Sequence, residues 1–126
     1  MHLIKNASVY TPEEIGVKDV LIGGGKILKI GDELPVEHAY DITVIDGTGK
    51  VLMPGLIDAH VHILGGGGEG GAKTRTPEIM LSDIITGGVT TVVGCLGTDG
   101  CTRTISNLLA KAKGLEEEGI TTYIYT

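Results

Sequence analysis

The chain has 126 residues, 21 of them glycine, a formal net charge of −6, and neither phenylalanine nor tryptophan. A complete (β/α)₈ barrel takes about 250 residues, so the length excludes a whole barrel within this chain. The acidic balance argues against a nucleic-acid or anionic-membrane partner, because both require a basic surface.

Short β-strands separated by turns are predicted for the first part of the chain. Glycine-rich turns at residues 23–25 and 46–49 indicate two hairpins, because glycine readily takes the positive φ of a tight turn. The expected strands are residues 3–10, 19–22, 27–30, 42–45 and 51–53. Strands this short and this regularly interrupted are typical of a small β-sandwich or part of one.

After Pro54, the sequence predicts alternating strands and helices. A helix is expected to begin at Thr76 as N-cap, with Pro77 at its first position and Gly87-Gly88 at its end. Its apolar face would consist of Met80, Leu81, Ile84 and Ile85. The other expected elements are a helix at residues 106–118, ended by Gly119, and strands at 56–63, 89–93 and 120–125. This β-α-β-α-β order predicts an α/β fold with a parallel sheet, either the opening of a barrel or a doubly wound sheet.

The strongest chemical signal is Asp58-Ala59-His60-Val61-His62 at the end of the strand predicted at residues 56–63. Residues two apart on a strand project to the same face, so His60 and His62 should present two imidazoles together. Imidazole is a preferred ligand of zinc and related ions. Two histidines on an ordinary polar face are the alternative. We favour a metal site because the strand is otherwise apolar and ends in a glycine-rich loop, although zinc needs further ligands.

A glycine-rich loop at residues 65–71 comes directly after this strand. A flexible linker is one interpretation, but the loop lies between a core strand and its crossover helix. Bare backbone there favours close approach to a ligand, and Glu69 among the glycines suits a cationic group such as a substrate ammonium. The phosphate-binding patterns match poorly, because Ala72 interrupts the Walker A ending and no acidic residue follows at the dinucleotide spacing.

A second loop, residues 94–100, follows the next predicted strand and should lie on the same rim. Thr98 offers a hydroxyl group there. Asp99, directly before Gly100, is expected to form a turn rather than to act as a catalytic acid.

The remaining cysteines and arginines carry less specific signals. Cys95 and Cys101 could be metal ligands, since thiolate suits zinc, but their spacing fits no zinc knuckle. Two cysteines are also too few to crosslink a small secreted domain. Free thiols in a soluble cytoplasmic protein are therefore predicted, and no signal peptide or membrane span is recognised. Arg75 and Arg103 could pair with an anionic substrate, but solvated charges are expected.

Residues 54–62, Pro-Gly-Leu-Ile-Asp-Ala-His-Val-His, resemble the first-strand signature of the amidohydrolase superfamily of metal-dependent hydrolases. Two further stretches are similar to the isoaspartyl dipeptidase (β-aspartyl peptidase) family within it. These stretches are residues 62–69 with 74–78, and residues 88–94 with 96–99. The His-x-His signature is common to the superfamily, whereas the two loops are the specific part, and the resemblance covers essentially all of the chain.

The resemblance implies the N-terminal part of a (β/α)₈ TIM-barrel metal-dependent hydrolase, preceded by strands of a small β-sandwich domain. Residues 1–53 would be the sandwich portion, and residues 54–126 the first three strands and two helices of an incomplete catalytic barrel. The implied activity is zinc-dependent hydrolysis of β-aspartyl (isoaspartyl) dipeptides by metal-activated hydroxide. The partners of such an enzyme would be its dipeptide substrate, the rest of the barrel and, once complete, further copies of itself.

The resemblance also assigns roles to single residues. His60 and His62 would bind one of two Zn²⁺ ions, and Gly67, Gly68, Glu69 and Thr98 match substrate-binding positions, with Glu69 on the α-ammonium of the substrate. The family's catalytic residues and remaining ligands would lie beyond Thr126, so the chain alone is expected to be inactive. The alternatives are part of another amidohydrolase, such as a dihydroorotase- or hydantoinase-like cyclic amidase, or a non-catalytic metal-binding remnant.

Overall fold

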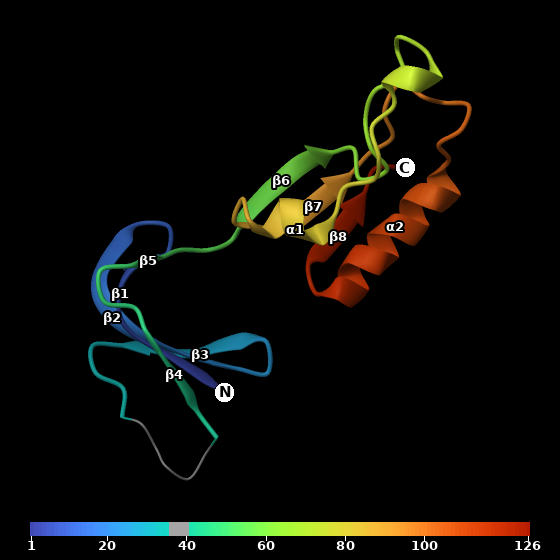
Figure 1. Cartoon of the computed structure of the whole chain (residues 1–126). Coiled ribbons are helices and arrows are strands. Elements are labelled where there is room, and N and C mark those ends of the chain that lie inside the picture. Colours follow the sequence, from blue (N-terminus) through green and yellow to red (C-terminus); the bar gives the residue numbers. More distant parts are fainter. Residues whose placement is uncertain (36–40) are drawn as a thin grey trace. The chain divides into compact units, whose positions relative to one another are not determined.

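A computed structural model describes residues 1–35 and 41–126 and divides the chain into two compact units, Met1–Pro54 and Gly55–Thr126 (Figure 1). Each unit contains its own sheet. No helix among the described residues is long and apolar enough to cross a membrane. The assignment of residues 1–53 and 54–126 to a sandwich and a barrel stays a prediction.

The first unit consists of strands in one mixed five-stranded sheet. Its strands are β1 (His2–Tyr10), β2 (Glu14–Gly23), β3 (Lys26–Gly31), β4 (Thr43–Asp46) and β5 (Val51–Leu52). The order is β3-β2-β1-β4, and β5 also pairs with β1. Gly24 and Gly25, with φ of 58° and 72°, form the two-residue turn between β2 and β3, so the first predicted hairpin is confirmed. The unit is β-rich as predicted, and the second layer of a sandwich stays a prediction.

The second predicted hairpin is wrong. Strands β4 and β5 both run parallel to β1 and pair with it, β4 along His2–Lys5 and β5 along Ser8–Val9. Between them the chain turns without reversing direction, because the Gly47 amide donates to the Lys5 carbonyl at 2.7 Å. The glycines at residues 46–49 therefore form an interruption in one edge of the sheet.

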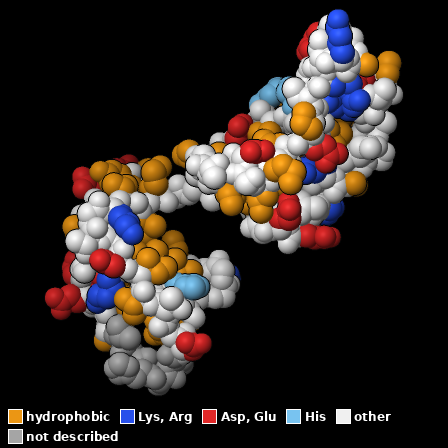
Figure 2. Space-filling view, viewed as in Figure 1, with side chains coloured by type: hydrophobic (Ala, Val, Ile, Leu, Met, Phe, Trp, Pro, Cys, Tyr) orange, Lys and Arg blue, Asp and Glu red, His pale blue; other side chains and the backbone are white. Residues whose placement is uncertain are grey.

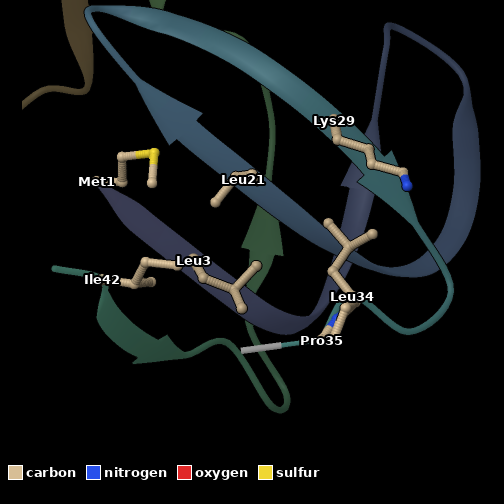
Figure 3. A pocket seen from close by; sticks show the side chains of 7 residues that line it. All are labelled: Met1, Leu3, Leu21, Lys29, Leu34, Pro35 and Ile42. Carbon is tan, nitrogen blue, oxygen red and sulfur yellow. The ribbon is translucent and has the colours of Figure 1, made fainter. Parts of the chain in front are cut away.

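A small apolar cluster holds this sheet, formed by Ala7, Val9 and Val20 with Ile4, Ile22 and Leu52 against it. A separate cavity of about 390 Å³ lies in the same unit (Figure 3). Its lining is apolar apart from Lys29 and consists of Met1, Leu3, Leu21, Lys29, Leu34, Pro35 and Ile42. The described lining contains no carboxylate, histidine or cysteine.

The second unit has the predicted β-α-β-α-β order. Its parallel sheet runs β6 (Leu56–Val61), β7 (Val89–Gly94) and β8 (Thr121–Ile124), with helices α1 (Leu81–Ile85) and α2 (Ile105–Glu118) and a short 3₁₀ turn, η1 (Ala72–Thr74). The α/β class is thus confirmed for this unit. The core between sheet and helices is formed by Ile63, Leu64, Ile84, Val92, Leu108, Ala112 and Leu115. Helix α2 is capped by the Thr104 side chain and ends at Gly119, whose φ is 113°.

The predicted start of the first helix is wrong. Thr76 and Pro77 lie in extended chain, and α1 begins only at Leu81, where Asp83 accepts a hydrogen bond from the Met80 amide. Thr76 does not cap a helix because its hydroxyl and amide both bond to Gly66. Ile84 is buried as predicted, but Met80 and Ile85 are exposed, so the expected apolar face is only partly formed.

Candidate metal and substrate site

The two histidines lie at the carboxyl end of β6, where the loops after β6 and β7 meet (Figure 1). The His60 and His62 rings are 5.3 Å apart between centroids and stand edge to face. His60 is exposed and His62 is half-buried. Figure 2 shows histidine side chains open at the surface of this unit. The prediction that the two imidazoles lie together is confirmed, whereas their role as metal ligands stays a prediction.

Cys95, the residue directly after β7, lies beside this pair. Its Sγ lies 3.5 Å from His62 Nδ1 and 3.6 Å from the Val61 carbonyl oxygen. Burial, aided by the nearby Asp58 carboxylate, raises the pKa of the Cys95 thiol above its usual value. The ligand atoms of His60, His62 and Cys95 all lie within 4.8 Å of one another. Two imidazoles beside a sulfur are a donor set that suits zinc or a related divalent ion.

The glycine-rich loop after β6 is folded tightly against residues 74–77. Gly65 and Gly67 have φ of 84° and 72°, and a Cβ on either would lie 2.2 Å from a backbone oxygen, that of Thr76 or Thr74. The Gly66 amide donates a hydrogen bond to the Thr76 hydroxyl at 2.7 Å. The loop therefore has a defined conformation that only glycine permits at these two positions, which argues against a flexible linker.

Glu69 and Thr98 meet across the two loops. The Thr98 hydroxyl lies 2.9 Å from Glu69 Oε1 and 3.4 Å from the Gly67 carbonyl oxygen. Hydrogen bonds from the Glu69 amide and from the Thr98 hydroxyl, with a smaller electrostatic contribution from the nearby His62 and Arg103 side chains, hold the pKa of Glu69 below its usual value. Both side chains are exposed. An ionised carboxylate at this rim can bind a cationic group.

Asp99 forms the turn that holds the second loop, as predicted. It accepts hydrogen bonds from the Cys101 and Thr102 amides at 3.2 and 3.0 Å. The Thr102 hydroxyl also donates to Asp99 and is the largest cause that lowers its pKa. Together with the two amide bonds and Arg75, it lowers the pKa of Asp99 to about 2. Arg75 pairs with Asp99 at 2.9 Å. Asp99 is therefore committed to structure rather than to proton transfer.

The expectation that Arg103 is a solvated charge is wrong. Its side chain is only 4% exposed and donates hydrogen bonds to three backbone carbonyls. Sequence reasoning missed this role, because nothing in the pattern around Arg103 indicates that the preceding glycine loop folds over it. The approach of Cys95 to His62 was missed for a similar reason, since the two lie 33 residues apart and meet only through the pairing of β6 with β7.

Comparisons with known proteins agree with this architecture. No family model matches the chain. The solved β-aspartyl dipeptidase of Fervidobacterium islandicum AW-1, in complex with a β-Asp-Leu dipeptide, is 56% identical with a TM-score of 0.91, over 99% of this chain and 32% of that one. The chain belongs to the amidohydrolase superfamily. A second structure of that dipeptidase gives a TM-score of 0.93 over 34% of its length.

Other members of the superfamily are more distant from this amidohydrolase chain. The dihydroorotase of Streptococcus pneumoniae serotype 4 is 36% identical over 124 residues, which are 95% of this chain and 28% of that protein. The allantoinase of Enterococcus faecalis is 46% identical over 66 residues, which are 52% of this chain and 13% of that protein. The chain thus spans about a third or less of the length of these relatives.

Proposed function

We propose that this chain is the N-terminal portion of a zinc-dependent isoaspartyl dipeptidase, which hydrolyses β-aspartyl dipeptides. The observation that carries the proposal is the Glu69–Thr98 pair at 2.9 Å, beside two histidines and on loops of defined conformation. The 56% identity to a β-aspartyl dipeptidase with bound β-Asp-Leu supports this substrate class. Residues 54–126 would then be the first three strands of a TIM barrel, and residues 1–53 part of its sandwich domain.

The substrate pocket would use the two loops together. Glu69 binds the α-ammonium of the β-aspartyl residue, because its carboxylate is ionised and open to solvent. Thr98 orients that carboxylate through its hydroxyl. Gly67 and Gly68 allow the substrate to approach the backbone closely, since neither carries a side chain. These groups bind and orient the dipeptide without taking part in proton transfer.

The metal site would receive two ligands from this chain. His60 and His62 would hold one of two zinc ions, and the donor set at the ends of β6 and β7 fits such an ion. Zinc there would activate water and stabilise the charge that develops on the isopeptide carbonyl oxygen. The other ligands and the residue that handles the proton belong to the rest of the barrel. The chain alone is therefore proposed to be inactive, and the complete enzyme to be a cytoplasmic homo-oligomer.

A cyclic amidase is the second candidate. The dihydroorotase match over 95% of the chain favours it, and the His-x-His signature serves both chemistries. A substrate without a free α-ammonium gives Glu69 no cationic partner, so this residue discriminates between the two candidates.

The test uses a chimaera in which this chain replaces the aligned part of the F. islandicum dipeptidase. Substituting Glu69→Gln removes the carboxylate charge but keeps the shape of the side chain. A hydrogen bond to a charged group contributes about 1.5–3 kcal/mol, so kcat/KM for β-Asp-Leu should fall roughly 10- to 150-fold. Glu117→Gln, at the exposed end of α2, is the matched control and should have little effect. Unchanged kcat/KM in the Glu69→Gln chimaera would favour the cyclic amidase.

A further inference from the structure

Arg103 is a buried cation between the second loop and helix α2. It directly precedes Thr104, the N-cap of α2, and its side chain is 4% exposed. A buried charge is costly unless hydrogen bonds replace the lost water. The hydrogen-bond partners of this guanidinium therefore indicate its structural role.

The guanidinium ties together the two limbs of the glycine loop. Its Nη1 donates to the carbonyls of Gly66 at 3.1 Å and Gly67 at 3.3 Å, and Nη2 donates to the Thr76 carbonyl at 2.9 Å. Gly66 and Gly67 belong to the outgoing limb, and Thr76 to the returning limb. One rigid planar group thus fixes both limbs at once, which the single ammonium of lysine does less well.

No carboxylate of the described residues lies within 4.0 Å of this guanidinium. Its Nε is buried without a hydrogen-bond partner in the same part of the chain. The charge is therefore compensated by carbonyl dipoles of the loop rather than by an ion pair. A buried guanidinium compensated only by carbonyl dipoles is not expected to stabilise the fold strongly. We therefore explain its presence by the loop conformation that it imposes.

The conformation that Arg103 imposes on the loop also affects Glu69, because the two residues are linked by hydrogen bonds through the Gly67 carbonyl and the Thr98 hydroxyl. The Gly67 carbonyl oxygen, held by Arg103, also lies 3.4 Å from the Thr98 hydroxyl, which bonds to Glu69 Oε1. We propose that Arg103 is a positioning residue that fixes the glycine loop and thereby places the Glu69 carboxylate for the substrate ammonium. The last step of this inference depends on the proposed dipeptidase function, whereas the fixing of the loop does not.

Amide hydrogen exchange on the full 126-residue chain tests the fixing of the loop. The amides of Gly66, Gly68 and Thr76 are hydrogen-bonded and should exchange slowly. Arg103→Met should accelerate their exchange at least about tenfold while the amides of α2 stay protected. Lys73→Met, which removes an exposed charge from the same loop, should leave the exchange unchanged.

Two exchange results would overturn the inference: an unprotected loop in the unsubstituted chain, or unchanged protection in Arg103→Met. If Arg103→Met also unfolds α2, the hydrogen exchange of the Arg103→Lys variant decides whether Arg103 fixes the loop. Lysine keeps the charge but not the planar fork, so the loop amides should exchange at least about threefold faster with α2 unaffected. Unchanged loop protection in Arg103→Lys would then count against the inference.

Kinetics of the chimaera test the placement of Glu69. The substrates are β-Asp-Leu and N-succinyl-leucine, which is the same molecule without the α-amino group. In Arg103→Met, kcat/KM for β-Asp-Leu should fall about 10- to 100-fold, mainly through KM, and that for N-succinyl-leucine less than about threefold. Arg103→Lys should recover part of the difference. An equal fall for both substrates would indicate a merely structural role and overturn the placement of Glu69.

The two experiments separate the inference from the proposed function. An unsubstituted, folded chimaera that leaves β-Asp-Leu intact contradicts the proposed function, and with it the placement of Glu69 for an ammonium. Hydrogen exchange still decides whether Arg103 fixes the loop, because it requires no substrate.

Discussion

Asp19 connects three separate segments of the first unit through one buried carboxylate. Its Oδ1 accepts a hydrogen bond from the Asn6 amide at 2.9 Å, where the backbone of β1 takes a φ of 58°. Its Oδ2 accepts from the Leu34 amide at 2.9 Å and lies 2.8 Å from Lys5 Nζ. The carboxylate therefore holds an irregular stretch of β1 and the chain after β3 to β2.

Substituting Asp19→Asn should destabilise the first unit by about 1–3 kcal/mol, because the Lys5 ammonium loses its partner and one amide loses its acceptor. Urea unfolding of the chain measures this loss. Asp32→Asn is the control, since Asp32 is 84% exposed in its pair with Lys18 and should change stability by less than about 0.5 kcal/mol. Equal losses in both variants would refute the role given to Asp19.

The same carboxylate predicts a pH dependence. Burial is the largest influence on the pKa of Asp19 and raises it, but hydrogen bonds from Leu34, Lys5 and Asn6 together outweigh burial and lower the pKa below its usual value. A lowered folded-state pKa stabilises the fold fully above the unfolded value near 4. The contribution should be lost as pH falls below about 4, and Asp19→Asn should remove this acid sensitivity.

Residue patterns predicted the part of the site that lies within one strand or one loop. The spacing of His60 and His62 at the end of β6 was sufficient to bring their rings together. Contacts made by Cys95 and Arg103 depend on how separate segments pack, and residue type alone favours a free thiol and a solvated charge. Long-range packing of this kind leaves no local pattern in the sequence.

Among the elements, the interrupted edge of β4 and β5 depends on Gly47. A Cβ at this position would lie 2.8 Å from the Lys5 carbonyl oxygen and 2.9 Å from the Ala7 Cβ. The sequence around it matches a hairpin turn equally well, because both structures need glycine where the chain bends. Only the pairing of both strands with β1 distinguishes them, and that pairing is non-local.

Gly47→Ala should therefore lower the free energy of unfolding by about 1–3 kcal/mol, the usual cost of overpacking. Gly114→Ala provides the opposite case, because Gly114 lies inside α2 with nothing within 4 Å of an added Cβ. Alanine there should stabilise the chain by about 0.5–1 kcal/mol, since it favours the helix over the unfolded chain. Chemical denaturation measures both changes, and a neutral Gly47→Ala would contradict the tight approach to β1.

At the scale of the whole molecule, each unit leaves large apolar side chains open to solvent (Figure 2). In the second unit the Ile57 side chain on β6 is 69% exposed and Tyr123 on β8 is 61% exposed. Large apolar side chains left open to solvent are characteristic of faces that another part of a protein covers. Together with coverage of about a third of the related dipeptidases, this surface fits the proposal that the rest of a barrel packs here.

Removal of metal should inactivate the chimaera. Treatment with a strong chelator should abolish hydrolysis of β-Asp-Leu, and added Zn²⁺ should restore it, because His60 and His62 are proposed to supply one ion's ligands. In a His60→Ala, His62→Ala double variant, added zinc should fail to restore activity, and the bound metal measured by mass spectrometry should fall. Full activity in the presence of chelator would contradict the proposed metal dependence.

The most direct test of the central claim compares the isolated 126-residue chain with the folded, zinc-loaded chimaera on β-Asp-Leu. We predict release of aspartate and leucine by the chimaera and none by the isolated chain, because the chain is proposed to supply the Glu69 pocket and two metal ligands, and the rest of the barrel the remaining groups. A folded, metal-loaded chimaera that leaves β-Asp-Leu intact, or an isolated chain that hydrolyses it at the rate of the chimaera, would contradict the account.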